Sequence, residues 1–167
     1  MERIDANAAC INLKLVDDGS SIYNKYLPKI EILYRLRERE DAETQPFSLL
    51  IKGKSQIVLL LHDEILVGYM VITRSYDLIH SPDYYKKGGL DKLGYFITSV
   101  AANPKYCHVV SRFFTWLEGH CFKTQAEYYW LQCSIKREGV HIIYKKQGLK
   151  DVSIYDGTWI MRKDIGG

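Results

Sequence analysis

One segment, residues 57–74, constrains the fold more than any other part of the chain. Ile57–Leu61 reads IVLLL, Ile65–Arg74 reads ILVGYMVITR, and the three residues between them are polar. Runs rich in β-branched residues favour strands, and a short polar interruption between two such runs is typical of a β-hairpin. We therefore predict a β-hairpin from residue 57 to residue 74.

Five further segments have the residue pattern of strands. The first of them alternates apolar and polar residues with a period of two. The last two flank Asp156-Gly157, a pair that is typical of a tight hairpin turn. The five predicted strands are Cys10–Val16, Gly94–Val100, Tyr128–Cys133, Val152–Tyr155 and Thr158–Arg162.

The segments between these strands carry apolar residues at helical spacing. Pro28 interrupts the first of them, which therefore forms either one kinked helix or two short helices. Gly148 is the expected C-terminal stop of the last one. The predicted helices are Ile22–Glu40, Gln45–Lys52, Val109–Phe122 and Arg137–Gln147. This order predicts an α/β fold with a mixed, mostly antiparallel central sheet of six to seven strands, flanked by helices.

The size and composition of the chain indicate an ordinary globular protein. Its 167 residues suit one domain over residues 1–167, and 47% of them are hydrophobic. Apolar runs stay shorter than the roughly 18–20 residues that span a membrane. Residues 1–10 lack the apolar stretch of a signal peptide, so we expect a cytoplasmic protein. The net charge of +3 is too small to indicate a nucleic-acid-binding tail.

Cysteine and histidine spacing gives no sign of a metal site. The four cysteines are far apart without a CxxC pair, and the five histidines show no HExxH spacing. We therefore expect no metal, and thiols that are buried and reduced. The cysteines are Cys10, Cys107, Cys121 and Cys133.

Three short motifs occur in an order that points to a known family. They are ILVGY at residues 65–69, VAANPKY at residues 100–106 and VHIIYKKQGL at residues 140–149. Together with the element order from Cys10 to Lys163, they resemble the GNAT (Gcn5-related N-acetyltransferase) superfamily. The family places a "vG" on its third strand, L-x-V-x-P-x-Y where the fourth strand ends, and A-x-x-L-Y-E-K-x-G-F on a later helix.

The resemblance implies transfer of an acetyl group from acetyl-CoA to an amine acceptor by direct attack. Backbone groups of Val100, Ala101 and Ala102 would bind the pantetheine arm, and the following loop and helix N-terminus would hold the pyrophosphate. Tyr144, at the matching position, would protonate the leaving thiolate as general acid. The alternative for Tyr144 is an amphipathic residue that packs at the end of a helix.

The cofactor loop departs from the family pattern R/Q-x-x-G-x-G/A, because residues 106–111 read YCHVVS and contain no glycine. Lys105, His108 and Arg112 supply cations that bind phosphate without close backbone approach. Arg137 stands where the family often has a cofactor-contacting Asn. Three interpretations stay open: an active acetyltransferase, an acyltransferase with another donor, or a non-catalytic binding module. The cofactor-binding residues implied by the resemblance are Val100, Ala101, Ala102, Lys105, Tyr106, Cys107, His108, Val109, Val110, Ser111, Arg112 and Arg137.

The acceptor is less constrained by the sequence. Tyr84 and Tyr85, in the YYKKGG stretch, are candidate acceptor contacts, and the alternative is a solvated loop. The amine could belong to a small molecule, a peptide, a protein or an aminoacyl-tRNA. A homodimer is a further hypothesis, because the last strand pair with Trp159 could extend the sheet across two copies.

Overall fold

The computed structural model describes residues 11–17, 19–38, 47, 55–74 and 94–166. The predicted helix at Gln45–Lys52, apart from Phe47, and the candidate acceptor contacts Tyr84 and Tyr85 lie outside these residues. Cys10 also lies outside them.

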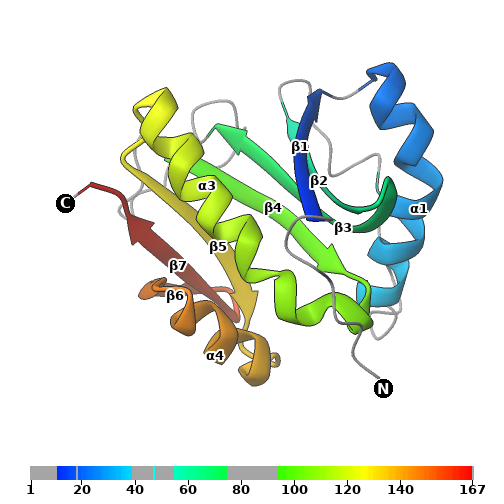
Figure 1. Ribbon diagram of the computed structural model, residues 1–167. Coiled ribbons are helices and arrows are strands. Elements are labelled where there is room, and N and C mark those ends of the chain that lie inside the picture. Colours follow the sequence, from blue (N-terminus) through cyan, green and yellow to red (C-terminus); the bar gives the residue numbers. More distant parts are fainter. Residues whose placement is uncertain (1–10, 18, 39–46, 48–54, 75–93, 167) are drawn as a thin grey trace. The chain divides into compact units, whose positions relative to one another are not determined.

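The described residues form one mixed sheet, and helices connect several of its strands along the chain (Figure 1). The seven strands of this part of the chain hydrogen-bond in the order β1-β2-β3-β4-β5-β7-β6. The β4–β5 pair is parallel, whereas β1–β2, β2–β3, β5–β7 and β6–β7 are antiparallel. The predicted fold class is therefore confirmed. The elements are β1 (Ile11–Asp17), α1 (Ser21–Glu38), β2 (Gln56–His62), β3 (Ile65–Arg74), β4 (Gly94–Ala102), the 3-10 helix η4 (Pro104–Val109), α3 (Ser111–Thr124), β5 (Tyr128–Ser134), α4 (Glu138–Lys146), β6 (Lys150–Tyr155) and β7 (Thr158–Asp164).

The chain divides into two compact units, which we describe separately. Unit 1 consists of residues 1–72 and 98–116, and unit 2 consists of residues 73–97 and 117–167. The division falls within β4, between Ile97 and Thr98. The expectation of a single domain stays a prediction.

The hairpin predicted from the apolar runs is present in unit 1 as β2 and β3. Ile57 lies opposite Val71, and the connection consists of Asp63 and Glu64. Both turn residues have positive φ angles, 49° and 69°, which a two-residue type I′ hairpin turn requires. The Tyr26 hydroxyl donates to the Glu64 carbonyl at 3.0 Å and so ties this turn to α1.

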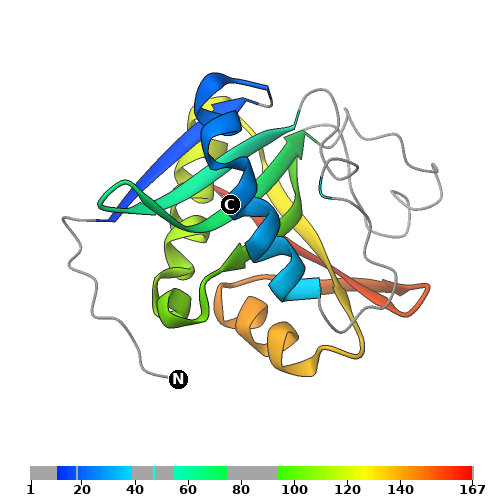
Figure 2. The same cartoon turned by 90° about the vertical axis from the view of Figure 1, so that its right-hand side faces the viewer.

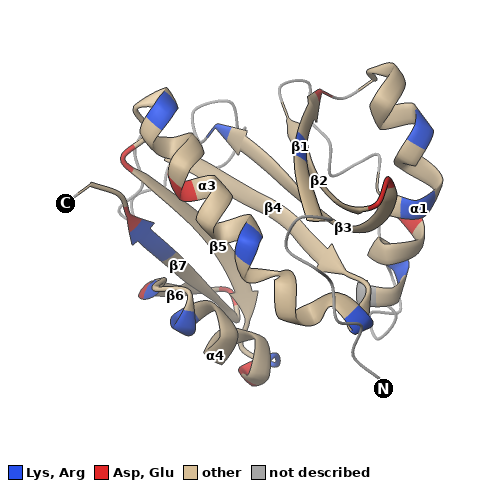
Figure 3. Ribbon diagram, in the orientation of Figure 1, with Lys and Arg blue, Asp and Glu red and all other residues tan. Residues whose placement is uncertain are grey.

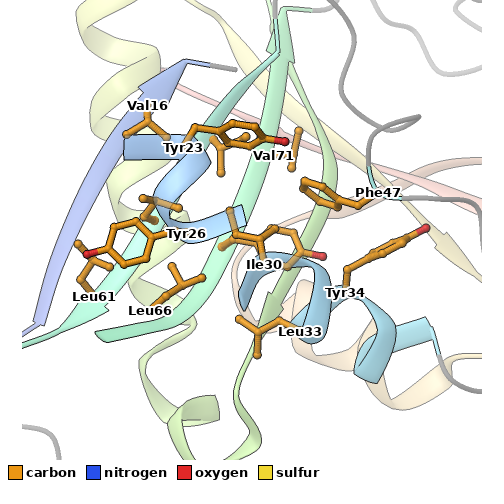
Figure 4. Close-up of a cluster of buried hydrophobic side chains, with 13 residues drawn as sticks. Val16, Tyr23, Tyr26, Ile30, Leu33, Tyr34, Phe47, Leu61, Leu66 and Val71 are labelled. Carbon is orange, nitrogen blue, oxygen red and sulfur yellow. The ribbon is translucent and has the colours of Figure 1, made fainter. Parts of the chain in front are cut away.

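The core of unit 1 lies between α1 and the strands (Figure 4). The sequence allowed either one kinked helix or two short helices around Pro28. In the structure, Pro28 lies inside a single helix, α1. Its proline ring is exposed, so the ring disturbs no core contact. The helix instead buries a face spaced at three and four residues, and all five residues there are aromatic or branched apolar side chains that pack in one cluster with residues of β2 and β3. The buried residues of α1 are Tyr23, Tyr26, Ile30, Leu33 and Tyr34.

Unit 2 contains β5, β6, β7 and α4, and α4 lies beside the strands of this unit (Figure 2). Gly94 begins β4 directly opposite Tyr128, and a Cβ at residue 94 would overlap the Tyr128 ring. The predicted turn at Asp156-Gly157 is present, with φ angles of 51° and 70°. The predicted stop at Gly148 is also confirmed, because this residue follows α4 with a φ of 96°.

The cysteines differ from expectation at one position. Cys121 and Cys133 are buried thiols, as predicted, but Cys107 is exposed. The expectation of a buried thiol is wrong there because η4 buries Tyr106 and Val109 and leaves Cys107 on its outer side. Within the described residues, no helix is long and apolar enough to cross a membrane.

Candidate functional site

The end of β4 is held close to β3 in unit 1. The Asn103 N–H donates to the Val67 carbonyl at 2.7 Å. A Cβ at Gly68 would lie 3.1 Å from the Ala101 carbonyl oxygen and 3.3 Å from the Ala102 Cβ. Glycine at position 68 therefore permits the close approach that fixes the backbone of Ala101 and Ala102, which gives the ILVGY motif a physical reason.

The opposite edge of β4 has little pairing. In the described residues, the parallel pairing of β4 with β5 consists of Gly94–Phe96 opposite Tyr128–Trp130. β4 continues to Ala102, six residues beyond this paired stretch. β5 continues to Ser134 and pairs with β7 along its whole length. The peptide groups of the second half of β4 on this edge can therefore accept an extended ligand as an added strand.

The segment after β4 is a 3-10 helix, and this differs from the predicted start of the next α-helix. The Asn103 side-chain oxygen accepts a hydrogen bond from the Lys105 N–H at 3.0 Å, and the Asn103 backbone carbonyl accepts one from the Tyr106 N–H at 2.8 Å. Pro104 occupies the first turn, where a missing N–H costs nothing. Val109 therefore belongs to η4, and α3 begins at Ser111.

The predicted cofactor loop is anchored by side chains in place of glycines. Tyr106 and Val109 are buried, each with 8% exposure, whereas Lys105, Cys107 and Ser111 are exposed. His108 and Arg112 are half-buried. The segment thus exposes Lys105, leaves His108 and Arg112 half-buried, and buries Tyr106 and Val109 as anchors.

The N-terminus of α3 is electropositive. Its first N–H groups have no acceptor within the helix, and the helix dipole adds positive potential there. The first turn contains no acidic residue, and Arg112 precedes Glu118 in the sequence of the helix. Figure 3 shows a basic position nearer the start of α3 than the acidic one. This combination favours an anion at the start of α3.

One contact to the loop was missed by the sequence analysis. His62 Nδ1 lies 2.7 Å from the Tyr106 hydroxyl, and the two rings meet edge to face at 5.5 Å. The Tyr106 ring in turn stacks on His108 with a ring separation of 6.5 Å. Because 44 residues separate His62 from Tyr106, no local pattern could have predicted this contact.

The remaining predicted site residues lie in unit 2. Arg137 is the N-cap residue of α4, and its carbonyl accepts the His141 N–H at 3.0 Å. Tyr144 is in the last turn of α4 with 8% exposure, and its carbonyl accepts the Leu149 N–H at 3.2 Å. The packed position of Tyr144 fits the alternative interpretation of this residue as well as the catalytic one.

A polar cluster fixes α4 on the last strands. His141 Nε2 lies 2.7 Å from Asp151 Oδ1, and its ring stacks on Trp159 at 3.6 Å. Lys145 Nζ lies 3.3 Å from Asp151 Oδ2. Burial works to raise the pKa of Asp151, but the hydrogen bonds with His141 and Lys145 outweigh it, so the pKa of this carboxyl is lowered.

Comparison with known proteins identifies the fold. No protein-family model matches the sequence, and no curated protein does. Tetrahymena GCN5 aligns with a TM-score of 0.68 and 14% identity, over 92% of this chain and 96% of that chain. An acetyltransferase from Streptococcus agalactiae aligns with a TM-score of 0.66 and 14% identity, over 93% and 99%. The ribosomal-protein-S18-alanine N-acetyltransferase from Escherichia coli has values of 0.64 and 12%, over 94% and 95%.

The chain therefore has the GNAT acetyltransferase fold, in a divergent form. The solved structures cover nearly the whole of the chain and are themselves covered nearly completely. The resemblance stated from the three sequence motifs is thus confirmed at the level of the fold.

Proposed function

We propose that this protein transfers an acyl group from acyl-CoA to an amine. The GNAT fold supports this proposal, and the observation that carries it is the β4 edge: the pairing with β5 ends at Phe96, while β4 runs on to Ala102. An acyl-CoA molecule carries a pantetheine arm with two amide groups, which can hydrogen-bond to Val100, Ala101 and Ala102 as a strand would.

The nucleotide end of the same molecule carries a pyrophosphate, and η4 with the start of α3 suits it. The dipole of α3 and the cations Lys105 and Arg112 can neutralise its charge, and the His108 side chain can donate a hydrogen bond to it. The rest of segment 106–111 would shape this site, with Tyr106 and Val109 as its buried anchors. We further propose Arg137 as a cofactor contact.

Acetyl-CoA is the donor that we propose, with direct attack by the amine. The amine nitrogen attacks the thioester carbonyl carbon while β4 backbone N–H groups bind the carbonyl oxygen. The C–S bond then breaks, and the Tyr144 hydroxyl donates its proton to the leaving thiolate. The proton lost by the amine passes to water.

The acceptor contacts of this proposal come from the sequence. Tyr84 and Tyr85 stay candidate acceptor contacts, because they lie outside the described residues. A cytoplasmic location and a homodimer through β6 and β7 also stay predictions.

The experiment that tests this function is a calorimetric titration of acetyl-CoA, with CoA as a comparison, followed by acetyl transfer to a panel of amines. We expect binding at about micromolar strength, equivalent to about −8 kcal/mol. Tyr144→Phe should bind the donor normally and lose about 10²- to 10⁴-fold in turnover. Tyr155→Phe, which removes another phenol hydroxyl of unit 2, is the matched control and should turn over normally.

The other two interpretations appear as distinct outcomes. Binding of a longer acyl-CoA in preference to acetyl-CoA would identify a different acyl donor. No detectable binding of any acyl-CoA at millimolar concentration would overturn the acyltransferase proposal and leave the non-catalytic binding module. The observation that favours this last alternative is the glycine-free segment 106–111, in which side chains take the place of the family's glycines.

A further inference from the structure

We propose that His62 is a positioning residue for the donor's diphosphate, acting through Tyr106. The inference rests on the proposed function. It assigns to a side chain of the β2–β3 hairpin the task of fixing the conformation of the glycine-free segment that follows β4.

The link between His62 and Tyr106 is short and well shielded. Nδ1 of His62 lies 2.7 Å from the phenol oxygen, and Tyr106 is only 8% exposed. His62 Nε2 lies 3.7 Å from Asp63 Oδ2. When the imidazole proton is on Nε2, near this carboxylate, the Tyr106 hydroxyl donates to Nδ1.

The partner on the hairpin side is rigid. His62 is the last residue of β2 and lies between two strands, opposite Ile11 of β1 and Ile65 of β3. A hydrogen bond to a residue held on both sides loses little conformational entropy when it forms. His62 is therefore a fixed point to which the loop can be attached.

The loop is tied to this hairpin at two places. The first is the backbone, because Tyr106 N–H donates to the Asn103 carbonyl and Asn103 N–H donates to Val67 of β3. The second is the phenol of Tyr106 on His62 of β2. Two attachments on neighbouring strands fix both the path of η4 and the direction of the Tyr106 ring.

The direction of this ring determines where the His108 side chain lies. The planes of the Tyr106 and His108 rings are 13° from parallel at a separation of 6.5 Å. His108 is half-buried, whereas Lys105 and Cys107 on either side of Tyr106 are exposed. A side chain binds phosphate more tightly when its position is fixed before the ligand arrives, because ordering it afterwards costs binding free energy.

The inference predicts selectivity between two donors. Acetyl-CoA carries the diphosphate and nucleotide, whereas S-acetylpantetheine has the same thioester and the same two amides without them. If His62 acts through η4, its removal lowers the affinity for acetyl-CoA and leaves the affinity for S-acetylpantetheine unchanged. A neutral hydrogen bond of this kind corresponds to a change of roughly 3- to 10-fold in the dissociation constant.

The test is calorimetry with both donors on the wild type and four variants. We expect His62→Ala and Tyr106→Phe each to raise the dissociation constant of acetyl-CoA about 3- to 10-fold. The dissociation constant of S-acetylpantetheine should stay unchanged. His62→Asn places an amide oxygen near the position of Nδ1, so it should restore most of the affinity. Tyr26→Phe is the matched control, because it removes a phenol hydrogen bond to the same hairpin turn without touching η4. It should lower the melting temperature and leave both affinities unchanged.

Four outcomes count against the proposal. Equal weakening of both donors, or no recovery in His62→Asn, would show that the hydrogen bond only supports the fold. Wild-type affinity in both His62→Ala and Tyr106→Phe would overturn the positioning role while leaving the proposed function intact. A wild-type protein that binds neither donor would overturn the proposed function and this inference together. Tyr106→Phe retains the buried ring, so it serves if His62→Ala does not fold.

Discussion

Replacing Gly68 by alanine is expected to damage the end of β4 directly. The new Cβ would lie 3.1 Å from the Ala101 carbonyl oxygen and 3.3 Å from both the Ala102 Cβ and a methyl carbon of Leu60. Two of these neighbours belong to the β4 chain, so relief requires the strand itself to move by a few tenths of an ångström. Inserting a methyl group into packing this tight costs about 1–3 kcal/mol.

The assay is urea denaturation of the wild type and two alanine variants. Gly119→Ala is the control, because a Cβ there meets nothing within 4 Å and Gly119 lies inside α3. Alanine in a helix interior is more favourable than glycine by about 0.5–1 kcal/mol, so this variant should become more stable. Gly68→Ala should become less stable by about 1–3 kcal/mol. Its dissociation constant for acetyl-CoA should rise as well.

A stable Gly68→Ala variant would refute this reasoning. If its free energy of unfolding equals or exceeds that of the wild type, β3 and the end of β4 are not in the close contact described. If the stability falls but acetyl-CoA affinity is unchanged, the contact exists and the backbone at Ala101 and Ala102 does not bind the donor.

Further expected outcomes concern α1, the Asp151 cluster and the thiols. Pro28→Ala should raise the free energy of unfolding by up to about 3 kcal/mol, because it restores a helix N–H, and a chemical denaturation curve shifted to lower urea would contradict this. The pKa of Asp151 is lowered in the folded state, so its contribution to stability is complete above the usual Asp pKa and is lost as pH falls through the lowered value. The stability difference between wild type and Asp151→Asn should therefore shrink on acidification, and a pH-independent difference would count against the cluster. Native-state alkylation followed by peptide mass spectrometry should label Cys107 well before Cys121, since burial, then the nearby Glu118, raises the pKa of the Cys121 thiol to about 12.

Features set by local chemistry were predictable from the sequence. The β2–β3 hairpin follows from two β-branched runs, and the turn at Asp156-Gly157 and the helix end at Gly148 follow from residues that adopt positive φ easily. The order of these elements and the three motifs then indicated the GNAT family, and the solved structures confirm the fold. Each of these predictions needed only neighbours within a few residues.

Features set by burial or by distant contacts were harder to predict. Val109 has the spacing of an α-helical core residue and is buried, but it belongs to η4, because Asn103 and Pro104 start a tighter turn first. The Asn-Pro pair was visible and could have given this result. Cys107 is exposed because of the face of η4 on which it lies, which sequence alone does not show.

Only part of the candidate site could be predicted from the sequence. The family motif led to Val100 and Ala102 at the end of β4, and the structure adds that the pairing of β4 with β5 ends well before them. The attachment of Tyr106 to His62 depends on the fold bringing together residues 44 positions apart. No motif encodes such a contact, so it emerges only from the structure.

Amide hydrogen exchange with and without CoA tests the central claim most directly. If the pantetheine arm adds to the free edge of β4 as a strand, saturating CoA should slow exchange in peptides that cover Thr98–Ala102 and the start of α3. Exchange in β1, which lies at the far edge of the sheet order, should not change. Saturating CoA that leaves exchange in Thr98–Ala102 unchanged would contradict the account.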